Sequence, residues 1–299
     1  MLAIQPTGQT LGATITGIDL KQALAKVDFA ALLRALANHG VLRFPNQLLN
    51  PLELKLFSER FGKPQILGQS KFFDPEPPEV TILSNIVENG KPIGVADAGQ
   101  TWHTDMAYSR TIGFVNVLVA YAVPMRDGQP LGATAFTNTQ AAYEDLPDDI
   151  KKRLDGAYAT HDVVKYREYL EVEKNKPRSP LTPEQRAKLP PVSHPLFLTH
   201  PLTGKKVIYV TPTFTVKIDG LPADESNVLL KLLIDHVLKP KYRYVNRWAV
   251  GDLLIWDHIG TWHNAAADYG PDEHRLIKRC QVMADRVFDP EFVRQALAA

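Results

Sequence analysis

The spacing of apolar residues near the start of the chain is helical. From Phe29 to Leu36, leucine and phenylalanine recur at i, i+3, i+4 and i+7, which gives an amphipathic stripe. Gly40 lies where such a helix would end, because glycine adopts the left-handed conformation common after a helix. The short apolar segment 41–44 follows directly. We therefore expect a helix that leads into a strand.

A second helix is predicted after residue 50. Asn50 is a favourable N-cap residue, Pro51 suits the first helical position, and Glu53 completes a capping box. Gly62 is placed to stop this helix after Phe61.

From residue 80 onward the pattern changes to short β-rich segments separated by Gly, Pro and Asp. These segments are 80–83, 113–123, 132–136, 207–210, 242–248, 252–256 and 275–287. Many short strands of this kind favour a sandwich or jelly roll. Helices are expected to interrupt them at 148–154 and 224–238. The predicted fold is mainly β with decorating helices, namely a double-stranded β-helix.

Residues 166–191 are rich in Lys, Pro and Glu, and we interpret them as a long mobile insertion. Long loops inside ordered domains often serve as active-site lids, so a lid is the expected role. No change in composition marks a second domain. We expect a single domain over residues 1–299.

Composition excludes several classes of function. Lys and Arg total 34 against 33 for Asp and Glu, so a net charge of +1 gives no basic field for nucleic acid or anionic lipid. Cys280 is the only cysteine, so no intrachain disulfide can form, which fits the reducing cytoplasm. The first residues lack the features of a secretory signal, and the apolar run 114–123 is about half of the ~20 residues that a membrane span needs. We expect a soluble cytoplasmic protein.

Candidate chemistry begins at Trp102-His103-Thr104-Asp105. A His and an Asp two residues apart on an extended segment point to the same side, so both can reach one ion. His263, just past a predicted strand, can supply a third ligand. Two His and one carboxylate that leave other coordination positions open suit an iron(II) oxygenase.

Other interpretations of these residues remain at this stage. A lone His-x-Asp pair is more often a surface hydrogen bond than a metal site. Two His and one Asp can also bind zinc, which would make the chain a metal-dependent hydrolase. A third possibility is a jelly-roll binding or sensor module without turnover.

The segment 268–274 contains a Gly-Pro-Asp turn, after which we expect the chain to return as a strand beside the segment of His263. Arg275 would then lie near the metal. Arg275 and Arg279 share one face of this strand, and if they point inward, two buried guanidinium groups predict anionic ligands inside the barrel. The alternative is that they form surface salt bridges with Asp268 or Asp285.

At this point the sequence resembles a known family, the taurine dioxygenase and 2,4-dichlorophenoxyacetate dioxygenase (TauD/TfdA) family of iron(II)/2-oxoglutarate-dependent enzymes. The shared features are His103-x-Asp105, the later His263 and Arg275 twelve residues beyond it. The resemblance spans nearly the whole chain. Its further segments are 11–20, 39–44, 57–62 and 199–206.

The resemblance implies that His103, Asp105 and His263 bind Fe(II), with 2-oxoglutarate and O2 as co-substrates. Arg275 would pair with the distal carboxylate of 2-oxoglutarate, and the hydroxyl of Thr134 would bind the same carboxylate. The implied reaction hydroxylates a substrate, in some cases with bond cleavage, and releases succinate and CO2.

The resemblance also indicates how the main substrate is held. Arg279 matches the position that binds the acidic end of a sulfonate or carboxylate substrate, and Phe214 matches an aromatic residue that lines the pocket. The partner is therefore expected to be a small organic anion such as a sulfonate or an aryloxyalkanoate. Family members are often dimers or tetramers, so a homo-oligomer is expected.

Three departures from the family pattern bear on the site. The family usually has Gly-Gly-Asp-Thr before its threonine, whereas this chain has Leu131-Gly132-Ala133-Thr134. His258 replaces a frequent asparagine and is a rival third metal ligand, although the match through 268–269 selects His263. Thr211 replaces another common asparagine, so the pocket is expected to differ from that of taurine oxidation. Halogenating relatives lack the carboxylate of Asp105, so its presence favours hydroxylation.

Overall fold

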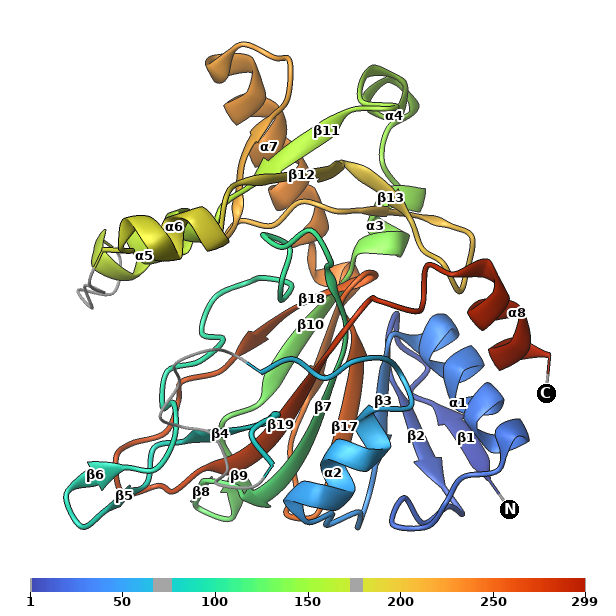
Figure 1. Cartoon of the computed structure of the whole chain (residues 1–299), viewed down its shortest axis with the longest axis vertical. Coiled ribbons are helices and arrows are strands. Elements are labelled where there is room, and N and C mark those ends of the chain that lie inside the picture. Colours follow the sequence, from blue (N-terminus) through green and yellow to red (C-terminus); the bar gives the residue numbers. More distant parts are fainter. Residues whose placement is uncertain (1, 67–76, 173–179, 299) are drawn as a thin grey trace.

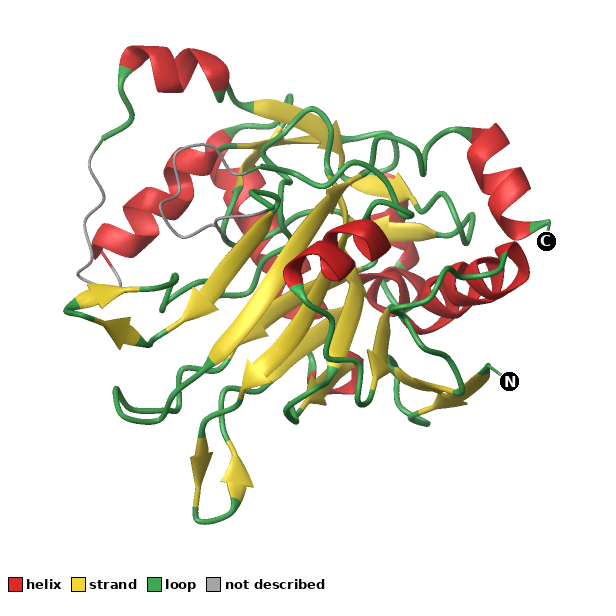
Figure 2. Cartoon of the chain, turned by 60° about the horizontal axis from the view of Figure 1, so that its bottom comes forward, coloured by secondary structure: helices red, strands yellow, loops and turns green. Residues whose placement is uncertain are grey.

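The computed structural model describes residues 2–66, 77–172 and 180–298. A seven-stranded sheet and a three-stranded sheet face each other and form the double-stranded β-helix (Figures 1 and 2). The large sheet has the order β1 (Ala3–Pro6), β2 (Ala13–Thr16), β3 (Val41–Phe44), β17 (Leu253–Asp257), β7 (Gly113–Ala122), β19 (Leu276–Met283), β4 (Val80–Ser84). The small sheet has the order β16 (Arg243–Asn246), β10 (Thr134–Asn138), β18 (Thr261–Ala265). The predicted fold class is confirmed.

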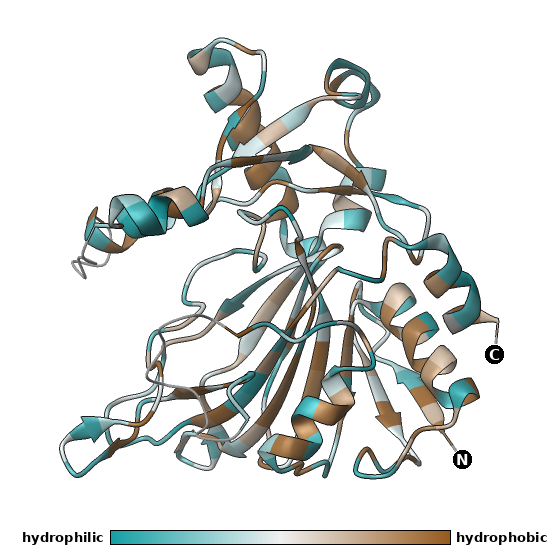
Figure 3. Cartoon of the chain, viewed as in Figure 1, coloured by the Kyte–Doolittle hydropathy of each residue, from teal (hydrophilic) through white to brown (hydrophobic). Residues whose placement is uncertain are grey.

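The central strands β7 and β17 of the large sheet are buried on both faces over most of their length, because alternate side chains enter two different cores. On β17, Leu253 and Ile255 join the core under the outer helices, whereas Leu254 and Trp256 join the core between the sheets. This is the period of two that a strand imposes. Figure 3 accordingly shows hydrophobic residues along the central strands.

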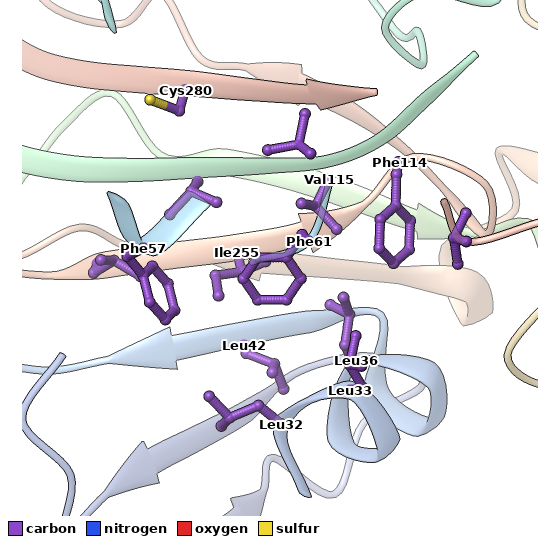
Figure 4. Close-up of a cluster of buried hydrophobic side chains, with 14 of the residues drawn as sticks. Leu32, Leu33, Leu36, Leu42, Phe57, Phe61, Phe114, Val115, Ile255 and Cys280 are labelled. Carbon is purple, nitrogen blue, oxygen red and sulfur yellow. The ribbon is translucent and has the colours of Figure 1, made fainter. Parts of the chain in front are cut away.

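The outer face of the large sheet is covered by α1 (Lys26–His39) and α2 (Pro51–Ser58) (Figures 1 and 2). Figure 4 shows the leucines of α1 together with Phe57 and Phe61 beside the strand residues Phe114 and Ile255. The predicted start of the second helix is confirmed, since Asn50 and Glu53 form a capping box. Its predicted end is wrong, because the helix stops at Ser58 and Phe61 lies in the turn that follows.

Gly40 ends α1 in the left-handed conformation, with φ of 66°. A Cβ at this position would lie 2.7 Å from the side chain of Leu11. Both facts explain why glycine stands where the chain turns from α1 into β3, so the predicted stop is confirmed.

A further layer lies beyond one end of the barrel and has its own core (Figure 1). Its helices are α3 (Thr139–Glu144), α4 (Asp148–Arg153), α7 (Ala223–Val237) and the short 3-10 helix Pro240–Tyr242. Its strands are β11 (Tyr158–His161), β12 (Val192–Pro195), β13 (Phe197–Thr199), β14 (Lys206–Ile208) and β15 (Thr215–Ile218). The remaining elements are α8 (Pro290–Leu297), which packs on α1, and the hairpins β5 (Val87–Glu88) with β6 (Lys91–Pro92) and β8 (Met125–Arg126) with β9 (Gln129–Pro130).

The segment predicted as a long mobile loop is partly helical. It contains most of α5 (Val163–Val172) and all of α6 (Pro183–Lys188), while 173–179 lie outside the described residues. Arg186 on α6 binds both carboxylate oxygens of Asp162, just before α5, at 2.7 Å. The loop prediction was wrong for these residues because charged side chains need not interrupt a surface helix.

The predicted neighbour of the returning strand was also wrong. β19 pairs with β7 and β4 in the large sheet, whereas β18, which carries His263, pairs with β10 in the small sheet. The turn between them therefore connects the two sheets instead of closing a hairpin. Among the described residues, no helix is long and apolar enough to cross a membrane.

Candidate active site

Backbone pairing brings the two candidate histidines together. The N–H of His103 donates to the carbonyl of His263 at 3.1 Å, and the N–H of His263 donates to the carbonyl of His103 at 2.8 Å. Residues paired in this way project to the same side, and the two ring centroids are 4.1 Å apart. The strand β18 thus fixes both histidines at once.

Asp105 completes a three-residue group at the mouth of the barrel. One ligand atom each from His103, Asp105 and His263 lies within 4.8 Å of the others. Among the described residues, these three form the group of side chains that could hold a metal ion. The Oδ1 atom of Asp105 lies 3.2 Å from Nε2 of His103. Both histidines are buried.

The hydrogen bonds of His103 fit a cation at this place. Its Nδ1 lies 2.7 Å from the carbonyl oxygen of Thr101, which can only accept, so Nδ1 carries the proton. With a second proton on Nε2 the ring would donate a hydrogen bond to the carboxylate of Asp105, whereas in the neutral ring Nε2 presents a lone pair to it. Two acceptors facing each other repel, and a cation bound to both would remove the repulsion.

The charge states of the other two residues also suit a metal. Burial alone would raise the pKa of Asp105, but the hydrogen bond with His103 and the charge of Arg279 hold it well below its usual value. Burial lowers the pKa of His263 well below its usual value. The site therefore offers an ionised carboxylate and a neutral imidazole, the forms that bind metal ions.

The second oxygen of Asp105 faces away from this group and is held by two donors. The side-chain amide of Asn116 donates to Oδ2 at 2.8 Å, and Nη1 of Arg279 donates to it at 3.2 Å. His258 is close as well, with Nε2 at 3.6 Å from the same oxygen, and burial lowers its pKa to about 4. His258 is thus a buried neighbour of Asp105 outside the three-residue group.

A small cavity adjoins His263 and is lined by Thr134, Arg275 and Arg279. Arg275 is 7% exposed, and none of the described carboxylates forms an ion pair with it. Burial lowers the pKa of Arg275, although the hydroxyl of Tyr269 partly offsets this effect. A buried guanidinium in this state favours an anionic ligand. The alternative of surface salt bridges for Arg275 is wrong.

Thr134 is oriented by a residue that the sequence did not single out. The indole N–H of Trp248 donates to Oγ1 of Thr134 at 3.0 Å. Because the indole can only donate, the hydroxyl of Thr134 keeps its own hydrogen for another acceptor. Gly132 nearby has φ of 68°, and a Cβ there would lie 3.2 Å from the ring of Tyr269, so both the backbone and the space favour glycine.

A larger cavity of about 440 Å³ opens on the side of His103 and Asp105. Arg279 and Phe214, which the family resemblance singled out, both line it. The ring of Phe214 lies 4.8 Å from that of Tyr108 and 5.9 Å from that of Tyr166 on α5. The cavity therefore combines one apolar, aromatic wall with a cation beside the group of potential metal ligands.

The model of the taurine catabolism dioxygenase TauD, TfdA family matches residues 3–281. The chain belongs to this family. Members of the TauD/TfdA family are Fe(II)- and 2-oxoglutarate-dependent dioxygenases, so the expected enzyme class and its cofactors are confirmed.

Individual relatives agree with the TauD/TfdA assignment over almost the full chain. Pentalenolactone F synthase of Streptomyces avermitilis is 30% identical over 95% of this chain and 94% of its own length. The 2,4-dichlorophenoxyacetate dioxygenase of a Burkholderia species is 29% identical over 91% of both chains. The structure of a putative taurine dioxygenase from Burkholderia xenovorans has a TM-score of 0.76 at 27% identity and covers 95% of this chain and 93% of that one.

The structure brings together every site residue that the TauD/TfdA resemblance singled out. These are His103, Asp105, His263, Thr134, Arg275, Arg279 and Phe214. Asn116 and Trp248 were missed. The sequence contains one signal that could have pointed to Asn116, because it is a single amide within the apolar run of β7.

Proposed function

We propose that this chain hydroxylates a small organic anion, with iron held by His103, Asp105 and His263. The observation that carries this proposal is the placement of two arginines around the three ligands. Arg275 lines the smaller cavity, and Arg279 lines both cavities. Arg275 is thus available for an anionic co-substrate. Arg279 donates Nη1 to Asp105 but keeps a buried Nε without a partner among the described residues, and this group can serve an anionic substrate.

In the proposed arrangement, Arg275 and Thr134 bind the distal carboxylate of 2-oxoglutarate. The guanidinium can offer two parallel N–H groups. The hydroxyl of Thr134 adds a third donor, because Trp248 donates to one of its lone pairs and leaves its hydrogen free. These donors would hold the co-substrate with its keto acid end toward the metal. Bound iron with 2-oxoglutarate supplies the O2 chemistry that hydroxylates a C–H bond and yields succinate and CO2.

Arg279 is the proposed site for the acidic group of the substrate. Taurine and 2,4-dichlorophenoxyacetate, for which relatives are named, both carry an acidic group. The aromatic wall around Phe214 would hold an apolar body, and 440 Å³ is within the range of small-molecule sites. An anion held at Arg279 would place a neighbouring carbon beside the metal.

The rings of Phe214 and Tyr108 would also exclude water from the reacting carbon. Burial raises the pKa of Tyr108 to about 12, so its hydroxyl stays neutral and can donate a hydrogen bond. Residues of α5 cover the outer side of the same cavity. Closure of the 166–191 segment as a lid, action as one domain, a dimeric or tetrameric state and a cytoplasmic location stay predictions.

The test is a panel of organic anions paired with neutral analogues of the same shape, such as a carboxylate with its amide. With Fe(II) and 2-oxoglutarate present, succinate release should rise with some anions and not with their neutral partners. The Arg279→Leu variant should lose this preference. Equal stimulation by anions and neutral analogues would refute the proposed substrate class.

A further inference from the structure

Asn116 is a polar residue in an otherwise apolar, fully buried stretch of the central strand β7. Its side chain has 0% exposure and shares the inner face of the strand with Leu118 and Ala120. A buried amide destabilises the fold unless it forms hydrogen bonds. Its amide Nδ2 donates a hydrogen bond to Oδ2 of Asp105 at 2.8 Å.

The other end of the same amide has no such partner. Oδ1 of Asn116 is buried and accepts no hydrogen bond from any described residue. Reversing the amide would place this oxygen against the carboxylate of Asp105, so the donor orientation is the favourable one. Asn116 gains one charge-assisted hydrogen bond but leaves one buried acceptor unpaired, so it adds little to the stability of the fold. The presence of an asparagine here is therefore better explained by its effect on the orientation of Asp105.

We propose that Asn116 is a positioning residue, whose amide holds Oδ2 of Asp105 so that Oδ1 is presented to the metal. This inference rests on the proposed role of Asp105 as a ligand. Oδ1 is the oxygen that lies 3.2 Å from Nε2 of His103, whereas Oδ2 receives the amide. Groups that orient metal ligands in this way commonly change metal affinity by about 10-fold to 100-fold.

Arg279 explains why a second donor is needed. It reaches Oδ2 from β19, the strand paired with β7, but at the longer distance of 3.2 Å, and it also lines the substrate cavity. If a substrate anion draws the guanidinium away, Asp105 loses that contact. The amide of Asn116 lies in the packed interior of the sheet and stays in place. Asn116 therefore keeps the ligand oriented before and after substrate binding.

The test compares Mn(II) binding with stability. Mn(II) is titrated into the purified protein, and the free ion is followed by electron paramagnetic resonance. Asn116→Leu is close in size to the original residue and should weaken the Kd by about 10-fold. The same variant loses the bond to Asp105 but also removes the unpaired Oδ1, so its urea midpoint should fall by no more than that of the control described next. Val117→Ala, on the same strand but in the opposite core, is the control and should lower the midpoint without changing the Kd.

A Kd for Asn116→Leu within twofold of wild type would overturn the proposal. If that variant does not fold, Asn116→Ala takes its place with the same expected loss of affinity. His103→Ala is measured in parallel to separate the two assignments. If His103→Ala loses affinity and Asn116→Leu does not, the role of Asn116 alone is refuted. If His103→Ala binds as wild type, the ligand assignment fails and this inference fails with it.

Discussion

Replacing Arg275 by leucine removes a buried guanidinium and keeps an apolar side chain in the cavity. The wild-type side chain is 7% exposed and has no ion pair with the described carboxylates. Two charge-assisted hydrogen bonds to the distal carboxylate of 2-oxoglutarate would be lost. Since bonds to charged groups contribute roughly 1.5–3 kcal/mol each, we take about 3 kcal/mol for the pair. This corresponds to a Kd for 2-oxoglutarate that is weaker by roughly 150-fold.

The same substitution should not destabilise the protein when 2-oxoglutarate is absent. Burial lowers the pKa of Arg275, which shows that the folded environment disfavours its charge. Removing an unpaired buried charge should therefore leave the unfolding midpoint unchanged or raise it. In the Mn(II)-loaded protein, 2-oxoglutarate at 100 times the wild-type Kd should add about 2.7 kcal/mol of stability to wild type and little to the variant.

The assay is calorimetric titration of 2-oxoglutarate into the Mn(II)-loaded protein without O2. Arg126→Leu is a suitable control, because Arg126 is an exposed arginine that pairs with Glu273 on the surface. Its Kd should stay within twofold of wild type. A Kd for Arg275→Leu within threefold of wild type would refute the assignment of the co-substrate site.

Four further outcomes are expected. Asp105→Gly should abolish hydroxylation and leave the fold intact by circular dichroism, and full activity would contradict the ligand assignment. Arg279→Leu, compared at saturating metal, should raise the KM for an anionic substrate far more than that for 2-oxoglutarate, and the reverse pattern would mean that the two arginines have exchanged roles. Gly132→Ala should lower the free energy of unfolding by about 1 kcal/mol or more in urea, since φ is 68° and the new Cβ meets Tyr269 at 3.2 Å. Burial lowers the pKa of His161 to about 3, so below pH 6.5 the unfolded chain takes up a proton that the folded chain does not. In urea unfolding, this residue should therefore contribute about 2 kcal/mol less stability at pH 5 than at pH 7. The His161→Leu variant should lack that part of the pH dependence.

Periodicity predicted the central strands of the barrel because each of them is buried on at least one face, whereas the exposed strand β1 was not predicted. The segments 113–123 and 252–256 correspond to β7 and β17 within one residue at each end. Neighbouring strands were harder to predict, since pairing depends on contacts between distant segments. The Gly-Pro-Asp turn was interpreted as a hairpin, yet it carries the chain from β18 in one sheet to β19 in the other.

The helices α5 and α6 were missed for a local reason. Their sequence is rich in charge and has a weak apolar stripe, so composition indicated a loop. The start of α6 is nevertheless encoded locally, because Thr182 and Gln185 form a capping box with Pro183 at the first position.

The site was predictable where residue types are restricted by chemistry. Two histidines and a carboxylate are difficult to replace as metal ligands, and a buried arginine is costly without an anion. The residues that orient them are less restricted. Trp248 meets Thr134 across 114 positions of sequence, and no local pattern indicates that contact.

The most direct test of the account is the visible spectrum of the protein titrated with Fe(II) and 2-oxoglutarate in the absence of O2. Chelation of the keto acid to iron should produce a weak charge-transfer band in wild type. His103→Ala and Arg275→Ala should both lose the band at the same concentrations, and Arg126→Leu should retain it. A wild-type protein that binds iron without this band, or variants that keep it at full strength, would contradict the proposed site.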